Sequence, residues 1–132
     1  MEATLRRFMG WEDAHYPGGL VSGGHLVELF GDVGTELMMR HDGDEGLLAT
    51  VTVDFLQPVY VGDLLEVSGR IVSVGRTSRR LAFEARKLGG HLDLPDNPAA
   101  AELLPEPVPV ARGTAVAVVK QERQRLRPEE RR

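Results

Sequence analysis

The chain contains no cysteine in its 132 residues. Disulfide bonds, thiolate metal ligands and cysteine nucleophiles are therefore excluded. The sequence also lacks any run approaching the roughly 20 apolar residues of a membrane-spanning helix, and its first residues lack the apolar stretch of a signal peptide. We therefore expect a soluble protein of the cytoplasm that does not enter a membrane.

A basic surface and internal repeats are missing as well. The formal net charge of −4 at pH 7 and the absence of a basic stripe argue against nucleic acid as a partner. A hydrophobic fraction of 42% over 132 residues is enough for one packed domain but not for two. We therefore predict one domain at residues 1–121 and a charged tail at residues 122–132 that is disordered or weakly helical.

Helical periodicity dominates the segment from residue 18 to residue 40. Apolar side chains recur there at three- and four-residue spacing, which predicts one buried helical face. The members of this face are Leu26, Leu29, Phe30, Val33 and Leu37. Ser22 is a suitable N-cap just before the run. The N–H groups of Gly23 and Gly24 then lie at the positive end of the helix dipole, where an anion or a polarised carbonyl oxygen can bind.

A polar arc borders the predicted apolar face of this helix. It contains the carboxylates of Asp32 and Glu36, which lie one turn apart and share a direction. Such an arc is either a solvated surface or part of a chemical site. Gly31 and Gly34 occupy the opposite side, and each costs about 1 kcal/mol relative to alanine inside a helix. This cost favours close packing, with the helix wrapped by a sheet or a second subunit and its carboxylates lining a cleft.

Alternating apolar residues after the helix predict an antiparallel sheet. A turn-forming cluster at residues 41–46 ends the helix. Strand patterns follow at residues 47–56, 64–74, 78–87 and 110–120. Short turns join them, which is typical of a meander.

Two regions fall outside these strands. Residues 1–9 predict a short strand or an irregular lead-in anchored by Leu5 and Phe8. Residues 88–109 contain five prolines and are predicted to leave the sheet, with at most one short helix at residues 99–104.

The loop before the helix carries the pair His15 and Tyr16. Pro17, Gly18 and Gly19 follow and forbid helix there, so this pair lies close to the start of the long helix. The two side chains are either structural or part of a site, and their position beside a glycine-rich helix start makes them candidates for substrate binding.

Two segments are the most specific in the chain: GDVGTEL inside the helix and QPVYVGD ahead of the second predicted strand. Together with FEARK, ARGTAVAVVKQ and the run DAHYPGGLVSGGHLVELFGDVGTELMMRHDGDEG, they make residues 10–121 similar to the small hotdog-fold acyl-CoA ammonia-lyases. These enzymes act on beta-alanyl-CoA and 3-aminobutyryl-CoA. One position departs from the family pattern, because Gly19 stands where the family has an asparagine, which bears on substrate identity more than on the fold.

The resemblance implies an α+β fold: a single hotdog domain with a long central helix wrapped by a curved antiparallel sheet. It implies a carbon–nitrogen lyase that reversibly eliminates ammonia from a beta-aminoacyl-CoA, with no metal and no cofactor beyond the CoA of the substrate. It also implies a homodimer, assembled as a trimer of dimers, with two active sites per dimer and CoA along the subunit boundary.

Such an elimination needs a base for the alpha proton, donors for the enolate oxygen and a place for the departing ammonium. The resemblance therefore implies that the N–H groups of Gly23 and Gly24 bind the thioester oxygen, with His15 and Tyr16 as further substrate contacts.

Burial of a carboxylate pair tends to raise one pKa while the other group stays ionised. Glu36 lies nearer the apolar stripe and is the predicted base, which leaves Asp32 for the ammonium. Basic side chains around the third predicted strand are candidates for the CoA phosphates. They are Arg76, Arg79, Arg80 and Lys87.

Two other functions fit the same fold. In an acyl-CoA thioesterase, the helix carboxylate would activate water or attack the thioester carbonyl. A non-catalytic protein would bind acyl-CoA and turn nothing over. Hydrolysis needs one carboxylate and a water, whereas ammonia elimination benefits from two carboxylates, and both Asp32 and Glu36 are present.

Overall fold

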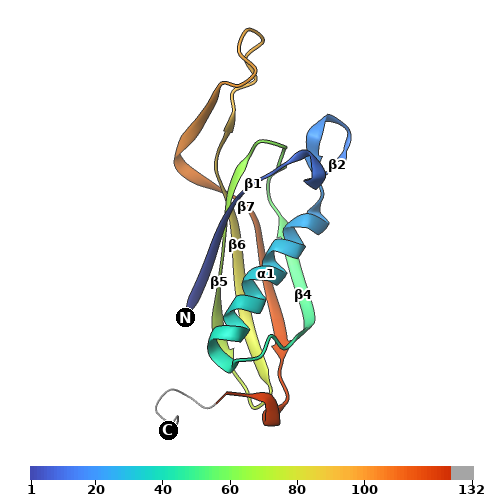
Figure 1. Cartoon of the computed structure of the whole chain (residues 1–132), viewed down its shortest axis with the longest axis vertical. Helices are drawn as coiled ribbons and strands as arrows, with labels where there is room; N and C mark the ends of the chain where they lie inside the picture. The colour runs from blue at the N-terminus through green and yellow to red at the C-terminus, as the bar shows by residue number, and fades with distance from the viewer. Residues whose placement is uncertain (126–132) are drawn as a thin grey trace.

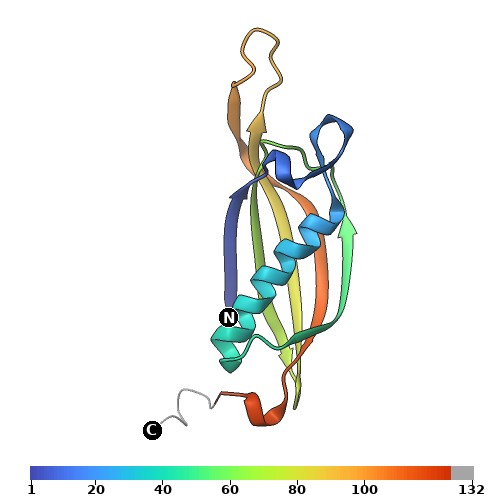
Figure 2. The same cartoon turned by 45° about the vertical axis from the view of Figure 1, so that its right-hand side comes forward.

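The computed structural model describes residues 1–125 (Figure 1). A long helix, α1 (Gly23–Asp42), lies diagonally across one face of a five-stranded antiparallel sheet (Figures 1 and 2). In spatial order, the strands are β1 (Glu2–Phe8), β5 (Leu64–Val74), β6 (Ser78–His91), β7 (Ala101–Val118) and β4 (Leu47–Phe55). This arrangement confirms the predicted α+β hotdog fold. No helix within residues 1–125 is both long and apolar enough to cross a membrane.

Both ends of α1 are capped. The Ser22 hydroxyl accepts a hydrogen bond from the N–H of His25 at 3.2 Å, which confirms the predicted N-cap. Gly43 adopts a left-handed conformation (φ 71°), and its N–H donates to the carbonyl of Met39. The helix therefore continues slightly past Arg40, because it ends only where glycine permits this turn.

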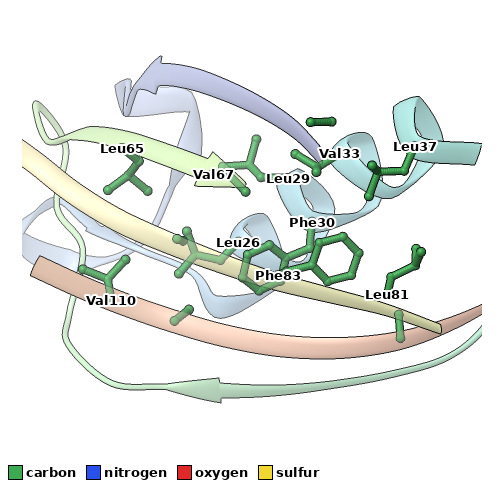
Figure 3. Close-up of a cluster of buried hydrophobic side chains, with 14 of the residues drawn as sticks. Leu26, Leu29, Phe30, Val33, Leu37, Leu65, Val67, Leu81, Phe83 and Val110 are labelled. Carbon is green, nitrogen blue, oxygen red and sulfur yellow. The ribbon is translucent and has the colours of Figure 1, made fainter. Parts of the chain in front are cut away.

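The apolar stripe of α1 packs on the sheet and forms the core (Figure 3). Each of the five residues predicted for it, Leu26, Leu29, Phe30, Val33 and Leu37, is at most 3% exposed. The Phe30 ring stacks on the Phe83 ring of β6 with centroids 5.1 Å apart. A Cβ at Gly34 would lie 3.3 Å from the Phe83 ring, which confirms close packing there. Gly31 has open space at its Cβ position, so packing within one chain does not explain this glycine.

β6 and β7 continue as a hairpin arm beyond the rest of the sheet (Figure 1). Residues 89–91 pair with residues 101–103, so the short helix predicted at residues 99–104 is wrong. The predicted excursion from the sheet is confined to residues 92–100. Pro105 and Pro107 are tolerated because the register shifts between Lys87 and Gly89, which places both prolines in a bulge where no ladder N–H is needed.

The two ends of the described chain are both attached to the domain. β1 is a strand of the sheet, but its anchor Phe8 is exposed, and Ala3 and Met9 are buried in its place. At the other end, Gln121–Arg123 forms one 3-10 turn, and the N–H of Arg125 donates to the carbonyl of Asp42. The predicted tail is thus ordered as far as residue 125, and the rest of it lies outside the described residues.

β4 is an edge strand that one chain leaves uncovered. Its pattern predicts one strongly apolar face, yet Leu47, Val51 and Phe55 are 77%, 40% and 54% exposed. An edge strand also presents unpaired backbone groups, which favour pairing with another chain.

Candidate active site

A pocket of about 560 Å³ opens at the N-terminal end of α1. Three segments line it: the first turn of α1, the end of β4 with the residues that follow it, and the small sheet formed by β2 (Ala14–Tyr16) and β3 (Leu20–Val21). Most of its side chains are apolar, including Leu20, Leu26 and Phe55. Tyr16 and Gln57 bring polar groups to it. A mostly apolar pocket with few polar groups is typical of a small-molecule site.

Gly23 and Gly24 present backbone to this pocket. The Ser22 side chain takes up the N–H of His25, so the N–H groups of Gly23 and Gly24 have no acceptor inside the helix. A Cβ at Gly23 would lie 2.7 Å from Cζ of Phe55, so a larger residue there would displace the exposed Phe55 ring at the pocket. At Gly24 only Ser22 Oγ lies within 4 Å, at 3.8 Å, and the backbone faces open space. The first turn can therefore donate hydrogen bonds to a ligand in the pocket.

The structure separates the two predicted loop residues. Tyr16 lines the pocket, whereas His15 does not. The His15 ring lies edge-on to the Tyr16 ring, with centroids 4.8 Å apart, so it contacts a residue that lines the pocket. The structure thus brings Tyr16 together with Gly23 and Gly24.

The predicted carboxylates lie elsewhere on α1. Asp32 is exposed, and within residues 1–125 it forms no ion pair. Glu36 is less exposed and binds Arg40 at 2.7 Å. At 1.5 Å rise per residue, Asp32 and Glu36 lie about 12 Å and 18 Å along the helix axis from Gly24. Neither lines the pocket of its own chain.

One of the four basic candidates for CoA binding is wrong. Arg79 is only 2% exposed, and its guanidinium binds both oxygens of Asp42 at 2.9 and 2.8 Å. Burial works to raise the pKa of Asp42, but the two hydrogen bonds and the charge of Arg79, together with the nearby His41 ring, hold that pKa below its usual value. The same guanidinium donates to the carbonyls of Gly75 and Ser78. Arg79 therefore uses four of its five N–H donors inside the protein and is too deeply buried to bind a phosphate.

The other three basic candidates remain predictions. Arg76 and Arg80 are exposed and follow β5, near the C-terminal end of α1. Lys87 lies at the pocket end of the molecule, where its ammonium is 3.2 Å from the Asp63 carboxylate.

A buried contact that the sequence does not predict lies behind the pocket. Asp13 Oδ1 is 3.2 Å from His25 Nε2, and these side chains are 4% and 11% exposed. Asp13 also accepts the N–H of Gly10 at 2.8 Å. No periodic spacing relates Asp13 to His25, because one lies in an irregular turn and the other in the helix.

Comparison with known proteins identifies the family of the chain. Residues 18–93 match the thioesterase superfamily. The chain is 45% identical over 127 residues to the 3-aminobutyryl-CoA ammonia lyase of Acetoanaerobium sticklandii, covering 95% of this chain and 99% of that protein. Its structure matches the beta-alanyl-CoA:ammonia lyase of Clostridium propionicum with a TM-score of 0.91 and 36% identity, over 95% of this chain and 89% of that chain.

A more distant match shows the fold alone. A hexameric broad-specificity acyl-coenzyme A thioesterase is 20% identical, with a TM-score of 0.72 over 94% of this chain and 83% of that chain. The lyase matches are full-length and far more similar in sequence. The chain therefore belongs to the thioesterase superfamily and, within it, to the hotdog-fold acyl-CoA ammonia-lyase family.

Proposed function

We propose that this protein reversibly eliminates ammonia from a beta-aminoacyl-CoA, converting 3-aminobutyryl-CoA to crotonyl-CoA or beta-alanyl-CoA to acryloyl-CoA. The observation that carries this proposal is the 45% identity, over nearly the full length of both chains, to a 3-aminobutyryl-CoA ammonia lyase. The pocket supports it, because it joins an apolar lining to two helix N–H groups without an acceptor in the helix.

The thioester oxygen of the substrate binds the N–H groups of Gly23 and Gly24. Removal of the alpha proton moves negative charge onto this oxygen, and donors already aimed at it stabilise that charge without rearranging. Loss of one such donor typically costs about 3–4 kcal/mol in the transition state. The thioester itself acidifies the alpha position and the amine leaves in its protonated form, so the reaction as proposed uses no metal or other cofactor.

The base comes from a second copy of the chain. A general base must lie within hydrogen-bond reach of its proton, whereas Asp32 and Glu36 lie about 12 Å and 18 Å along the helix from the Gly24 donor of their own chain. The uncovered edge strand β4 reaches the pocket through Phe55 and supports pairing of two copies at this edge. Pairing gives a homodimer with two sites, and we propose that three dimers form a hexamer.

We assign the two carboxylates different tasks. Glu36 is the less exposed of the two and takes the alpha proton. Asp32 has no ion-pair partner within residues 1–125, so its charge is available to the departing ammonium. CoA lies along the subunit boundary, with Arg76, Arg80 and Lys87 as candidates for its phosphates.

One incubation tests the proposed function. The protein is mixed with crotonyl-CoA and ammonia, and both the enoyl absorbance and free thiol are followed. The lyase removes absorbance without releasing thiol, and only when ammonia is present. Thiol release would identify a thioesterase, and saturable binding of crotonyl-CoA without either change would identify a non-catalytic binding protein.

A further inference from the structure

Two histidines of α1 hold a buried ring nitrogen against a carboxylate, one at each end of the helix. Within residues 1–125, only His25 Nε2 and His41 Nδ1 are buried side-chain nitrogen or oxygen atoms without a well-aligned hydrogen bond. His25 Nε2 lies 3.2 Å from Asp13, and His41 Nδ1 lies 3.1 Å from Asp42. Each contact brings a buried ring nitrogen close to a carboxylate, so the contact at one end of the helix serves as a matched control for the contact at the other end.

The contact at the N-terminal end closes a loop. Asp13 lies in the turn after β1, and the chain returns through β2 and β3 to Ser22 before it reaches His25. Asp13 also accepts the N–H of Gly10 and lies 3.6 Å from the Arg7 guanidinium, which fixes it to the end of β1. His25 thus joins the first turn of α1 to a carboxylate that is held independently of the helix.

This closed loop carries two walls of the pocket. Tyr16 and Leu20 belong to the loop, and Gly23 and Gly24 belong to the turn that His25 anchors. His25 itself does not line the pocket. Its effect on a ligand therefore passes through the backbone of the two preceding glycines.

We infer that His25 is a positioning residue, which holds the first turn of α1 against Asp13 so that the N–H groups of Gly23 and Gly24 stay aimed at the thioester oxygen. This inference rests on the proposed function. Donors for a developing oxyanion act through their direction, and a misplacement of about 1 Å can lower a rate by about 100-fold. If the first turn of α1 rotated, the N–H groups of Gly23 and Gly24 would no longer point at the thioester oxygen, although the pocket would remain.

Two substitutions of His25 by neutral amides of different length test its role as a positioning residue. In His25→Gln the amide nitrogen stands near the place of Nε2 and reaches Asp13. In His25→Asn the amide is too short to reach it. His41→Leu serves as the control, because it removes the matching contact at the far end of α1, about 24 Å from His25 along the helix axis.

Three measurements are made on each variant: kcat and KM for amination of crotonyl-CoA, the thermal midpoint of unfolding, and the Raman carbonyl stretch of bound crotonyl-CoA. We expect His25→Asn to lower kcat by about 10- to 100-fold, to change KM less than about threefold, and to reduce the carbonyl shift seen on binding. His25→Gln should keep kcat within about threefold of the value of the unsubstituted protein. His41→Leu should lower the thermal midpoint and leave kcat and the carbonyl shift unchanged.

The results overturn the inference in any of three cases. His25→Asn retains kcat and the carbonyl shift, or His25→Gln fails to restore them, or His41→Leu lowers kcat as much as His25→Asn. Failure of the proposed function is recognised separately, because the unsubstituted protein would then add no ammonia to crotonyl-CoA. The carbonyl shift of the bound ester still tests the position of the two donors in that case.

Discussion

The C-terminal end of α1 is closed by side-chain and backbone hydrogen bonds, whereas at the capped N-terminal end the N–H groups of Gly23 and Gly24 are left open to a ligand. At the C-terminal end, Arg79 binds Asp42 with two hydrogen bonds, and Gly43 and Arg125 satisfy backbone carbonyls. At the N-terminal end, Ser22 caps only the N–H of His25. One helix thus uses its polar groups for stability at one end and keeps donors for a ligand at the other. This difference locates the site more directly than the acidic arc does.

The largest expected effect on activity comes from removing the proposed base Glu36, which a second copy of the chain would bring to the open end. Glu36→Gln should abolish exchange of the alpha proton of a saturated acyl-CoA in deuterated buffer, because a positioned general base contributes about 100- to 10,000-fold. Binding of the CoA ester should stay nearly unchanged. The exchange is followed by mass spectrometry of the recovered ester.

Asp32→Asn is the matched variant for this test. It should spare part of the exchange and weaken binding of the beta-amino substrate selectively, because an amide offers the ammonium only a dipole. Near-normal amination by both variants would show that the arc is only a solvated surface.

The next largest effect is on stability and comes from breaking the ion pair between Arg79 and Asp42 at the C-terminal end of α1. Arg79→Leu leaves the Asp42 carboxylate buried without its partner, which should lower the free energy of unfolding by about 3–5 kcal/mol. Urea denaturation measures this change. Replacing both Arg79 and Asp42 by leucine should cost less than Arg79→Leu alone, since no unpaired charge remains buried. An equal or larger cost for the double variant contradicts this account of the closed end.

A smaller effect should separate the two glycines of the open end. Gly23→Ala places a methyl group 2.7 Å from the Phe55 ring, which is exposed and can turn away, so it should destabilise the fold by at most about 1 kcal/mol. Gly24→Ala meets open space and should leave stability unchanged or raise it by up to about 1 kcal/mol. Urea denaturation compares the two variants. Equal stability of the two variants would mean that the contact with the Phe55 ring does not favour glycine at residue 23.

The smallest expected effect is a dependence of the free energy of unfolding on acidic pH, which comes from Asp42 at the C-terminal end of α1. Burial raises the pKa of Asp42, but the hydrogen bonds and charge of Arg79, with the nearby His41 ring, outweigh this effect and lower the pKa in the folded protein. Its contribution to stability is therefore complete above the pKa of the unfolded chain and is lost as the pH falls through the lower folded value. Stability should fall as the pH drops below about 4.

Glu66 adds to this acid dependence, since the hydrogen bond from Arg86 lowers its pKa as well. Glu66→Gln removes that part and serves as the control. Arg79→Leu should remove the part that comes from Asp42, which urea denaturation at several pH values would detect. An unchanged acid dependence in Arg79→Leu would assign the effect to other carboxylates.

The helix, its N-cap and its buried face could be predicted because each rests on local chemistry or on spacing along one element. The burial of Arg79 could also have been predicted from spacing. Alternate residues of a strand face the same side, so Arg79 shares the inward face of β6 with the buried Leu81 and Phe83. The extended hairpin could not be predicted, because a bulge that tolerates Pro105 and Pro107 depends on strand register. The contact between Asp13 and His25 depends on the path of a loop and leaves no pattern in the sequence.

The uncovered edge of β4 links catalysis to concentration. On the proposed assembly, a monomer carries half of each of two sites, so dilution below the dissociation constant of the dimer removes activity without unfolding the chain. In that range the rate rises with the square of the protein concentration and not in proportion to it. A hybrid dimer of one subunit defective in its donors and one defective in its carboxylates would hold one intact site and one doubly damaged site. Two inactive preparations would then regain activity when mixed.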